Sequence, residues 1–173
     1  MEKISAFKDI LSVPRNIVIT THRGPDGDAI GSSLAISHFL KKFGHSVNVI
    51  TPNNYADFLH WIPGNEDVLI YEGNEDKAQS ITKAAEVIFL IDFSNINRIS
   101  DFAESVINAK AVKILIDHHQ DPDMNIADIV FSDIKASSTA QIVYEIIDAL
   151  DCKNYINKDI AECLYVGILT DTG

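Results

Sequence analysis

The sequence predicts an α/β fold with a mostly parallel, doubly wound sheet that carries helices on both faces. Segments typical of strands alternate along the chain with segments whose apolar residues recur every three or four positions, which is the helical period. Residues 87–91 (VIFLI) are entirely apolar, a composition that favours a strand buried on both faces of a parallel sheet. The 173 residues are enough for one such domain with its own core.

Six short runs are interpreted as strands because they are rich in β-branched residues and are separated by helical or turn-forming segments. The alternation of strands with helices indicates parallel pairing, because each crossover between parallel strands contains a helix. The last run is expected to form an edge strand. The strands are expected at residues 16–21, 46–51, 67–71, 87–91, 112–116 and 129–131.

Six other segments carry an apolar stripe at helical spacing. Gly44 marks the end of the second of these helices. A short helical turn is expected at residues 55–60, and Trp61 after it is expected to pack in the core or at a hinge. The helices are expected at residues 4–11, 29–43, 75–85, 100–109, 139–150 and 158–169.

The chain is acidic, with 25 Asp and Glu residues against 14 Lys and Arg residues and a formal net charge of −11. Such a surface repels nucleic acid, which argues against a DNA-binding module that works through a basic patch. It does not exclude a phosphate-processing enzyme, because bound divalent cations invert the local sign of the charge.

The composition also predicts the compartment. No apolar run approaches the ~20 residues that span a bilayer, and the first residues do not have the pattern of a secretory signal. Cys152 and Cys163 are too few for a disulfide framework and are expected to be reduced thiols. We therefore expect a cytoplasmic protein without a membrane partner.

Reactive side chains follow three of the expected strands. The first strand runs into His22, the fourth into Asp92, and the fifth into Asp117, His118 and His119. The carboxyl ends of parallel strands share one edge of a sheet, and ligands bind in the crevice at that edge. These residues, although far apart in sequence, are therefore predicted to converge.

The loop after the first strand adds two carboxylates in the pattern H-x-x-x-D-x-D, formed by His22, Asp26 and Asp28. Asp28 lies where a helix N-cap is expected. Capping alone explains neither Asp26 nor a histidine at the end of the strand. Carboxylate oxygens with an imidazole are ligands that suit Mn, Mg or Co cations.

Asp171 is expected just after the last helix, where a carboxylate opposes the helix dipole by roughly 0.3–1 kcal/mol. A nearby cation would remove this conflict, whereas a solvated Asp close to the end of the chain is the alternative. The remaining histidines, His38, His45 and His60, have no such neighbours and are expected on helix faces or at the surface.

These motifs resemble those of the DHH phosphoesterases, a family named for the sequence that here is Asp117-His118-His119. The resemblance is strongest to the small cytoplasmic branch that acts as a nanoRNase and as a 3′-phosphoadenosine 5′-phosphate phosphatase, and weaker to the long-chain exonucleases. The matching segments follow the family's order over nearly the whole chain: 21–33 (THRGPDGDAIGSS), 90–98 (LIDFSNINR), 114–119 (ILIDHH), 136–145 (ASSTAQIVYE) and 167–173 (GILTDTG).

The resemblance implies a site for two divalent cations, with Mn favoured over Mg or Co. One group of ligands would hold the first ion, another group would hold the second, and one carboxylate would bridge them. The implied ligands are His22 and Asp26 for the first ion, Asp28, His118 and Asp171 for the second, and Asp92 as the bridge.

The resemblance also implies roles around the metals. Asp117 would orient His118 through a hydrogen bond, as outer partners of metal-bound imidazoles do. His119 would contact the scissile phosphate and assist the leaving group. Arg98, Ser137 and Ser138 would lie near the substrate.

The expected reaction is phosphoester hydrolysis by a hydroxide that bridges the two cations, whose charge also stabilises the phosphoryl oxygens. The substrate would be a nucleotide or a short single-stranded nucleic acid, and the protein could form a homodimer. Members of this branch continue into a second, DHH-associated domain with a glycine-rich substrate loop. We therefore expect residues 1–173 to be a catalytic DHH domain that lacks this second domain and much of the substrate cleft.

Three alternatives remain open. The same ligand set is similar to that of family II inorganic pyrophosphatases and of cyclic dinucleotide phosphodiesterases. A nucleotide-binding regulatory module would use Gly24, Gly27 and Gly31, but their spacing is not G-x-G-x-x-G, and Asp26 and Asp28 would repel a pyrophosphate. A scaffold with a decayed site is disfavoured because all the implied metal ligands are present.

Overall fold

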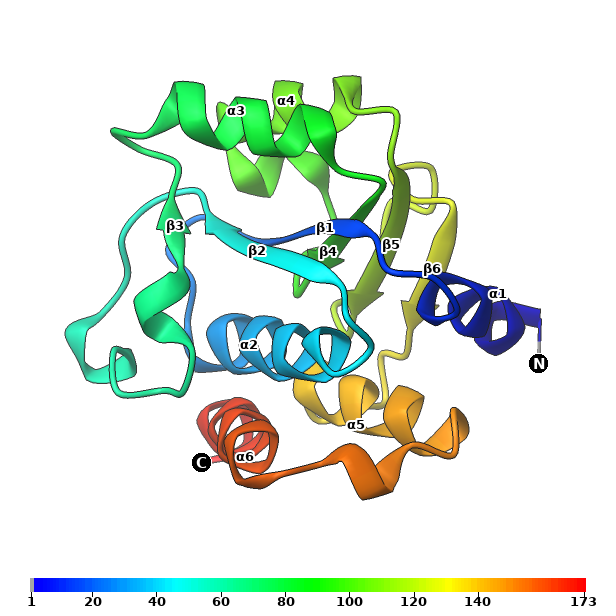
Figure 1. Ribbon diagram of the computed structural model, residues 1–173. Coiled ribbons are helices and arrows are strands. Elements are labelled where there is room, and N and C mark those ends of the chain that lie inside the picture. Colours follow the sequence, from blue (N-terminus) through cyan, green and yellow to red (C-terminus); the bar gives the residue numbers. More distant parts are fainter. Residues whose placement is uncertain (1) are drawn as a thin grey trace.

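The computed structural model describes residues 2–173 and has a parallel six-stranded sheet between two layers of helices (Figure 1). The strand order is β3-β2-β1-β4-β5-β6, and every neighbouring pair is parallel. The predicted doubly wound α/β fold is therefore confirmed. The strands are β1 (Asn16–Thr21), β2 (Ser46–Thr51), β3 (Leu69–Ile70), β4 (Val87–Ile91), β5 (Val112–Asp117) and β6 (Ile129–Ser132).

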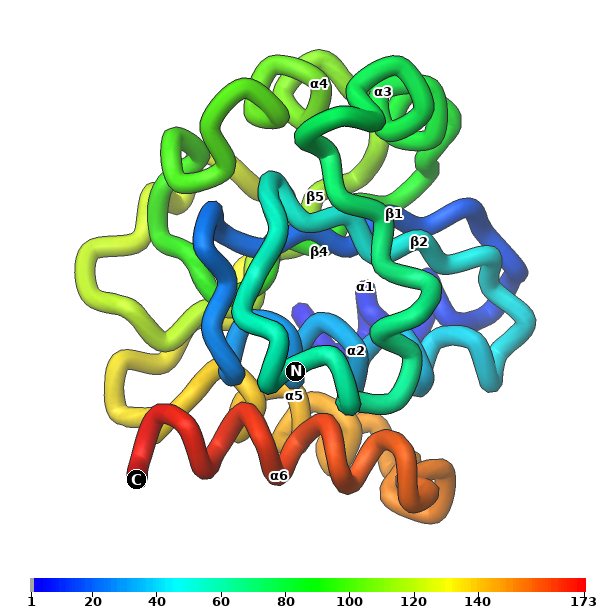
Figure 2. Tube along the Cα trace, turned by 90° about the vertical axis from the view of Figure 1, so that its left-hand side faces the viewer, coloured from blue at the N-terminus to red at the C-terminus, as the bar shows by residue number. Residues whose placement is uncertain are grey.

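Helices cover both faces of the sheet, with α3 and α4 on one face and α1, α2 and α5 on the other (Figure 1). The helix α6 lies outside α2 and α5 and adds a further layer there (Figure 2). Among residues 2–173, no helix combines the length and the apolar composition needed to cross a membrane. The helices are α1 (Glu2–Leu11), α2 (Gly27–Lys41), α3 (Glu75–Ala84), α4 (Phe102–Asn108), α5 (Thr139–Ala149) and α6 (Lys158–Thr172).

Two hydrophobic cores form because successive strand side chains point to opposite faces of the sheet. In β1, Ile17 and Ile19 belong to the core shared with α1, α2, α5 and α6, whereas Val18 belongs to the core under α3 and α4. Burial on both faces explains why strands such as β4 are apolar at every position.

The register of the central strands brings their carboxyl ends to one level. Thr21 of β1 is paired with Ile91 of β4, which is in turn paired with Ile116 of β5. The residues that follow these positions, His22, Asp92 and Asp117, therefore lie next to one another at one edge.

Two glycines allow the outer helix α6 to approach its neighbours closely. A Cβ atom at Gly31 of α2 would lie 2.5 Å from the Cys163 carbonyl oxygen, and one at Gly167 would lie 2.6 Å from the Ala140 Cβ. Any larger residue at either position would push α6 away. This packing fixes the far end of α6, which carries Asp171, relative to the sheet edge.

Two helix ends differ from the sequence expectation. The helix α2 begins at Gly27, and Asp26 rather than Asp28 is its N-cap, accepting a hydrogen bond from the Ala29 amide at 3.0 Å. The helix α6 continues to Thr172, so Asp171 lies in its last turn rather than after it. The dipole argument is strengthened, because the carboxylate lies within the negative end of the helix.

Two side chains lie where the sequence did not place them. Trp61 is 61% exposed and is not a core residue, whereas its neighbours Leu59 and Ile62 are buried. His45 is buried rather than superficial, and its Nδ1 accepts a hydrogen bond from the Arg15 amide.

Candidate metal centre

Six potential ligands converge at the carboxyl edge of the sheet in two groups, and a third group, formed by Asp92, His118 and His119, shares one residue with each of them. Within each group, one possible ligand atom from each residue lies within 4.8 Å of the others. We call the two groups of ligands the first group and the second group. The first group consists of His22, Asp26 and Asp92, and the second group consists of Asp28, His118 and Asp171.

The first group is built on the end of β1 and the loop after it. His22 Nε2 lies 3.6 Å from Asp92 Oδ2 and 3.9 Å from Asp26 Oδ2. The other ring nitrogen, Nδ1, is 3.0 Å from the Arg23 carbonyl oxygen and can donate to it. That hydrogen bond leaves Nε2 with a free lone pair directed at the two carboxylates, which is the tautomer a metal ligand needs.

The second group joins three elements. His118 follows β5, and its Nε2 lies 3.1 Å from Asp171 Oδ2 of α6 and 3.8 Å from Asp28 Oδ2 of α2. Asp28 is fully buried and accepts hydrogen bonds from the amides of Thr139 and Ala140 at the start of α5. The second group therefore depends on the packing of α2 and α5 against the sheet and of α6 against these two helices.

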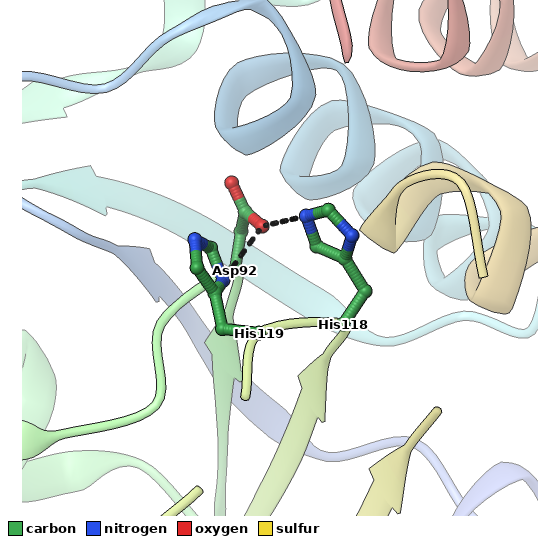
Figure 3. A group of neighbouring side chains, drawn as sticks. All are labelled: Asp92, His118 and His119. Carbon is green, nitrogen blue, oxygen red and sulfur yellow. Dashed lines mark ion pairs between the residues drawn. The ribbon is translucent and has the colours of Figure 1, made fainter. Parts of the chain in front are cut away.

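Asp92 lies between the two groups. Its Oδ2 faces His22. Its Oδ1 lies 3.7 Å from His118 Nε2 and 3.7 Å from His119 Nδ1. Figure 3 shows these two imidazoles on either side of the carboxylate. The backbone of Asp92 has φ 65°, in the left-handed region that Asp and Asn tolerate better than other L residues. This turn at the end of β4 aims the carboxylate between the flanking imidazoles.

The carboxylates repel one another in this arrangement. Burial, followed by the charge of Asp92, raises the pKa of Asp28 to about 8. Burial and the charge of Asp92 also raise the pKa of Asp171, although His118 opposes the shift. A nearby cation, Arg23, forms an ion pair with Glu72 instead. Crowded oxygen ligands with two imidazoles form a donor set that fits a hard or borderline divalent cation.

The pKa of His22 is shifted by the same carboxylates. Burial disfavours the imidazolium and lowers the pKa, but the contact with Asp92 and the hydrogen bond to the Arg23 carbonyl act in the opposite direction. The charges of Asp92 and Asp26 add to this effect, so the pKa of His22 is raised. The shift is another sign of the negative charge gathered at this site.

Asp117 contacts a different histidine from the one expected. Its Oδ1 accepts a hydrogen bond from His119 Nδ1 at 2.7 Å, and no hydrogen bond joins it to His118 among the described residues. Both imidazoles follow the end of β5 and lie beside Asp92, with their ring centroids 4.9 Å apart, but only His119 reaches Asp117. Asp117 is buried, and His119 is 42% exposed with Nε2 free of protein partners in residues 2–173.

The three residues expected near the substrate have different environments. Arg98 is exposed on a 3₁₀ turn, and its carbonyl accepts from the Arg23 amide at 2.7 Å, which places it beside the loop after β1. Ser137 is exposed. Ser138 is buried and is the N-cap of α5, because its hydroxyl accepts from the Gln141 amide at 3.1 Å. The Ser138 hydroxyl is thus already used within the protein.

Sequence reasoning missed Thr139. Its hydroxyl donates to Asp92 Oδ1 at 2.8 Å, and its amide donates to Asp28 Oδ2 at 2.6 Å. The signal available was the position of Thr139 at the first turn of an expected helix, where amides lack partners within the helix. The sequence did not reveal that the acceptors are two carboxylates more than forty residues away.

The fold and these side chains define an α/β protein with a candidate binuclear metal centre at the carboxyl edge of a parallel sheet. Residues 16–168 match the model of the DHH family, N-terminal domain, and the chain belongs to this family.

Several known proteins are similar to most of the chain. The probable bifunctional oligoribonuclease and PAP phosphatase NrnA of Streptococcus mutans is 31% identical over 98% of this chain and 51% of its own length. NrnA of Thermus thermophilus is 31% identical over 99% of this chain and 48% of its own length. The crystal structure of an exopolyphosphatase-related protein from Bacteroides fragilis has a TM-score of 0.96 at 40% identity and covers 99% of this chain and 50% of that one. The chain therefore spans about half the length of these relatives.

More distant relatives carry other names. The cyclic-di-AMP phosphodiesterase GdpP of Bacillus subtilis is 27% identical over 96% of this chain and 26% of its own length. A probable manganese-dependent inorganic pyrophosphatase of Streptococcus mutans is 23% identical over 90% of this chain and 48% of its own length. The crystal structure of exonuclease RecJ bound to manganese has a TM-score of 0.61 at 15% identity, covers 99% and 42% of the two chains, and shows likeness of fold alone.

Proposed function

We propose that this chain is the metal-binding domain of a phosphoester hydrolase that acts on short oligonucleotides or on 3′-phosphoadenosine 5′-phosphate. The observation that carries the proposal is the pair of ligand groups joined through Asp92. Two divalent cations placed side by side are the recurrent device for in-line displacement at phosphorus. Membership of the DHH family supports the same reaction class.

The first group would hold one cation, the second group would hold the other, and Asp92 would be a ligand of both. We propose Mn²⁺ because the donors are carboxylates and imidazoles and because a relative is named manganese-dependent. When bound, such ions supply positive charge to the phosphoryl oxygens and lower the pKa of a water molecule. Their four positive charges would also offset the repulsion among Asp26, Asp28, Asp92 and Asp171.

His119 is the side chain best placed to handle a proton. Its Nδ1 donates to the buried Asp117, which fixes the orientation of the ring. Its Nε2 is then available to donate a hydrogen bond or a proton to an oxygen of the substrate. When the phosphorus–oxygen bond breaks, the leaving oxygen would take this proton, and the attacking water would supply the new oxygen on phosphorus.

The proposed substrate class rests on the names of the relatives and not on the shape of a substrate-binding cleft. The two NrnA proteins are named as oligoribonucleases and PAP phosphatases, and they are more similar to this chain than the GdpP and pyrophosphatase relatives are. Since the chain spans about half the length of these proteins, affinity for a substrate is expected to involve residues outside it.

Substrate comparison with Mn²⁺ tests the proposal. Hydrolysis of a ribodinucleotide, 3′-phosphoadenosine 5′-phosphate, pyrophosphate and a cyclic dinucleotide would be measured for the wild type and Asp92→Asn. We expect turnover of the first two substrates, abolished by the substitution. Preference for pyrophosphate or the cyclic dinucleotide would replace the substrate assignment and keep the metal assignment. Equal turnover by wild type and Asp92→Asn would overturn the metal assignment.

The structure gives little support to a dinucleotide-binding module. In such modules, the pyrophosphate lies against the amino end of the helix after the first strand. Here the carboxylate of Asp26 caps that end of α2. The position is thus already filled by a negative group, which would repel a pyrophosphate in the absence of metal.

A further inference from the structure

The amino end of α5 lies against the carboxylates of the candidate metal centre. The amides of Thr139 and Ala140 donate to Asp28 Oδ2 and Oδ1 at 2.6 and 2.9 Å. The first amides of a helix have no partner within it and favour a negative charge. In this protein, a carboxylate from a different helix, α2, takes that place.

These hydrogen bonds restrict how Asp28 can bind a cation. An ionised carboxylate has about four lone-pair positions, two on each oxygen. Oδ1 accepts from the Ala140 amide and from the Ser32 hydroxyl at 3.0 Å, so both of its positions are used. Within residues 2–173, Oδ2 accepts a hydrogen bond from the Thr139 amide alone and faces His118 Nε2 at 3.8 Å. Asp28 can therefore offer one oxygen to the second group.

The hydroxyl of Thr139 restricts Asp92 in the same way. It donates to Asp92 Oδ1 at 2.8 Å, on the side of the carboxylate that faces His118. Thr139 is fully buried, so water does not compete for this hydrogen bond. One residue thus holds a carboxylate of the second group through its backbone and the carboxylate shared by both groups through its side chain.

We propose that Thr139 is a positioning residue of the metal centre. Its hydroxyl fixes the rotation of the Asp92 carboxylate, so that Oδ2 faces the first group while Oδ1 faces the second. Its amide simultaneously fixes Asp28 relative to Asp92. This inference rests on the proposed metal-dependent function, because it concerns the same carboxylates.

The chain supplies matched variants for a test. Thr139→Val has nearly the same shape but removes the donor to Asp92, whereas Thr139→Ser retains a hydroxyl. Both keep the backbone amide that holds Asp28. Ser138→Ala removes the N-cap of α5 and weakens the same helix end without touching Asp92. It therefore reports what a general loosening of α5 does.

The experiment is a Mn²⁺ titration of the four proteins by calorimetry, with electron paramagnetic resonance of the loaded samples and a thermal melt of each. Loss of a partner behind a metal ligand typically weakens metal binding by about 10–100-fold. We expect a loss of this size for Thr139→Val, together with an altered resonance spectrum. Thr139→Ser should restore both, and Ser138→Ala should lower the melting temperature but keep the wild-type affinity and spectrum.

Two results would overturn the inference while leaving the proposed function intact. One is a Thr139→Val protein that binds two Mn²⁺ ions with wild-type affinity and spectrum. The other is an equal loss of affinity in Ser138→Ala, which would assign the effect to the helix end as a whole. A folded wild-type protein that binds no Mn²⁺ would instead overturn the proposed function and this inference with it.

Discussion

The two ligand groups are built in different ways. The first group comes from the end of β1, its loop and the end of β4, two strands that are direct neighbours in the sheet. The second group combines α2, the end of β5 and the last turn of α6, and α5 holds one of its carboxylates. Strand pairing thus assembles one group, whereas helix packing assembles the other.

This difference predicts unequal sensitivity to perturbation. The hydrogen bonds between β1 and β4 set the register of these strands and so hold His22 and Asp92 side by side. The second group depends on side-chain packing between helices, where a shift of α6 moves Asp171 directly. We therefore expect changes in the helical layer to weaken the second metal position before the first.

The largest effect should come from the residue that the groups share. Asp92→Asn removes a negative ligand from both groups, while Asn keeps the size of the side chain and tolerates the left-handed backbone. We expect at least one of two Mn²⁺ ions to be lost in calorimetry, with a wild-type circular dichroism spectrum. Retention of both ions at wild-type affinity would show that Asp92 does not join the groups.

Single-group substitutions should separate the two positions. Asp171→Asn and His22→Gln each remove one ligand from a different group. Each protein is expected to keep one tight Mn²⁺ site, and the double variant should keep none. The measurement is Mn²⁺ stoichiometry by calorimetry. Loss of both ions in either single variant would contradict the view that the two groups bind their cations independently.

A smaller effect is expected from the helical layer. A Cβ atom in Gly167→Ala would lie 2.6 Å from the Ala140 Cβ and 2.9 Å from Asp28 Oδ1. Overpacking of this kind destabilises a protein by about 1–3 kcal/mol. We expect chemical denaturation to show that loss, and Mn²⁺ titration to show weakening of one site only.

The control for Gly167→Ala is Ala161→Ser on the exposed side of α6. This change should alter the free energy of unfolding by no more than about 0.5 kcal/mol and leave both metal sites intact. Equal weakening of both sites by Gly167→Ala would contradict the assignment of the second group to helix packing.

The last effect concerns pH in the presence of a chelator. The pKa of Asp28 is raised from its usual value of 3.8 to about 8, so between these values the folded protein binds more protons than the unfolded chain. Stability then falls as pH rises through that range. Asp171 and His22, whose pKa values are also raised, act in the same direction.

Chemical denaturation in a chelator at pH 5 and pH 8 would measure this effect, with an expected loss of at least about 1 kcal/mol at the higher pH. Asp28→Asn should remove part of the difference. Added Mn²⁺ should reverse the trend, because metal ligands must be deprotonated. Equal pH dependence in wild type and Asp28→Asn would show that Asp28 does not carry it.

The sequence predicted the features that depend on strands. Apolar runs located the four central strands. The rule that parallel strands share a carboxyl edge then predicted that His22, Asp92 and His118 lie close together. The same reasoning could not choose the partner of Asp117, because His118 and His119 both lie beyond the end of β5, where the strand pattern no longer sets the directions of side chains.

Features that depend on helix packing were less accessible from the sequence. The N-cap of α2 was assigned to Asp28, but that residue is buried under α5 and α6 because Gly31 and Gly167 let the helices approach. Thr139 was overlooked for the same reason, since its partners belong to other elements. Periodicity describes which face of a helix is apolar, but not which carboxylate lies opposite its first turn.

At Asp92, the left-handed backbone and the binding of a cation make separate demands on the side chain. A saturation library at this position, sorted first for soluble expression, should be enriched in Asp, Asn and Gly, the residues that adopt φ 65° with least strain. The same library sorted for retained Mn²⁺ should contain Asp alone among these three. The two selections would thus show which residues at position 92 permit folding and which of them also bind the cation.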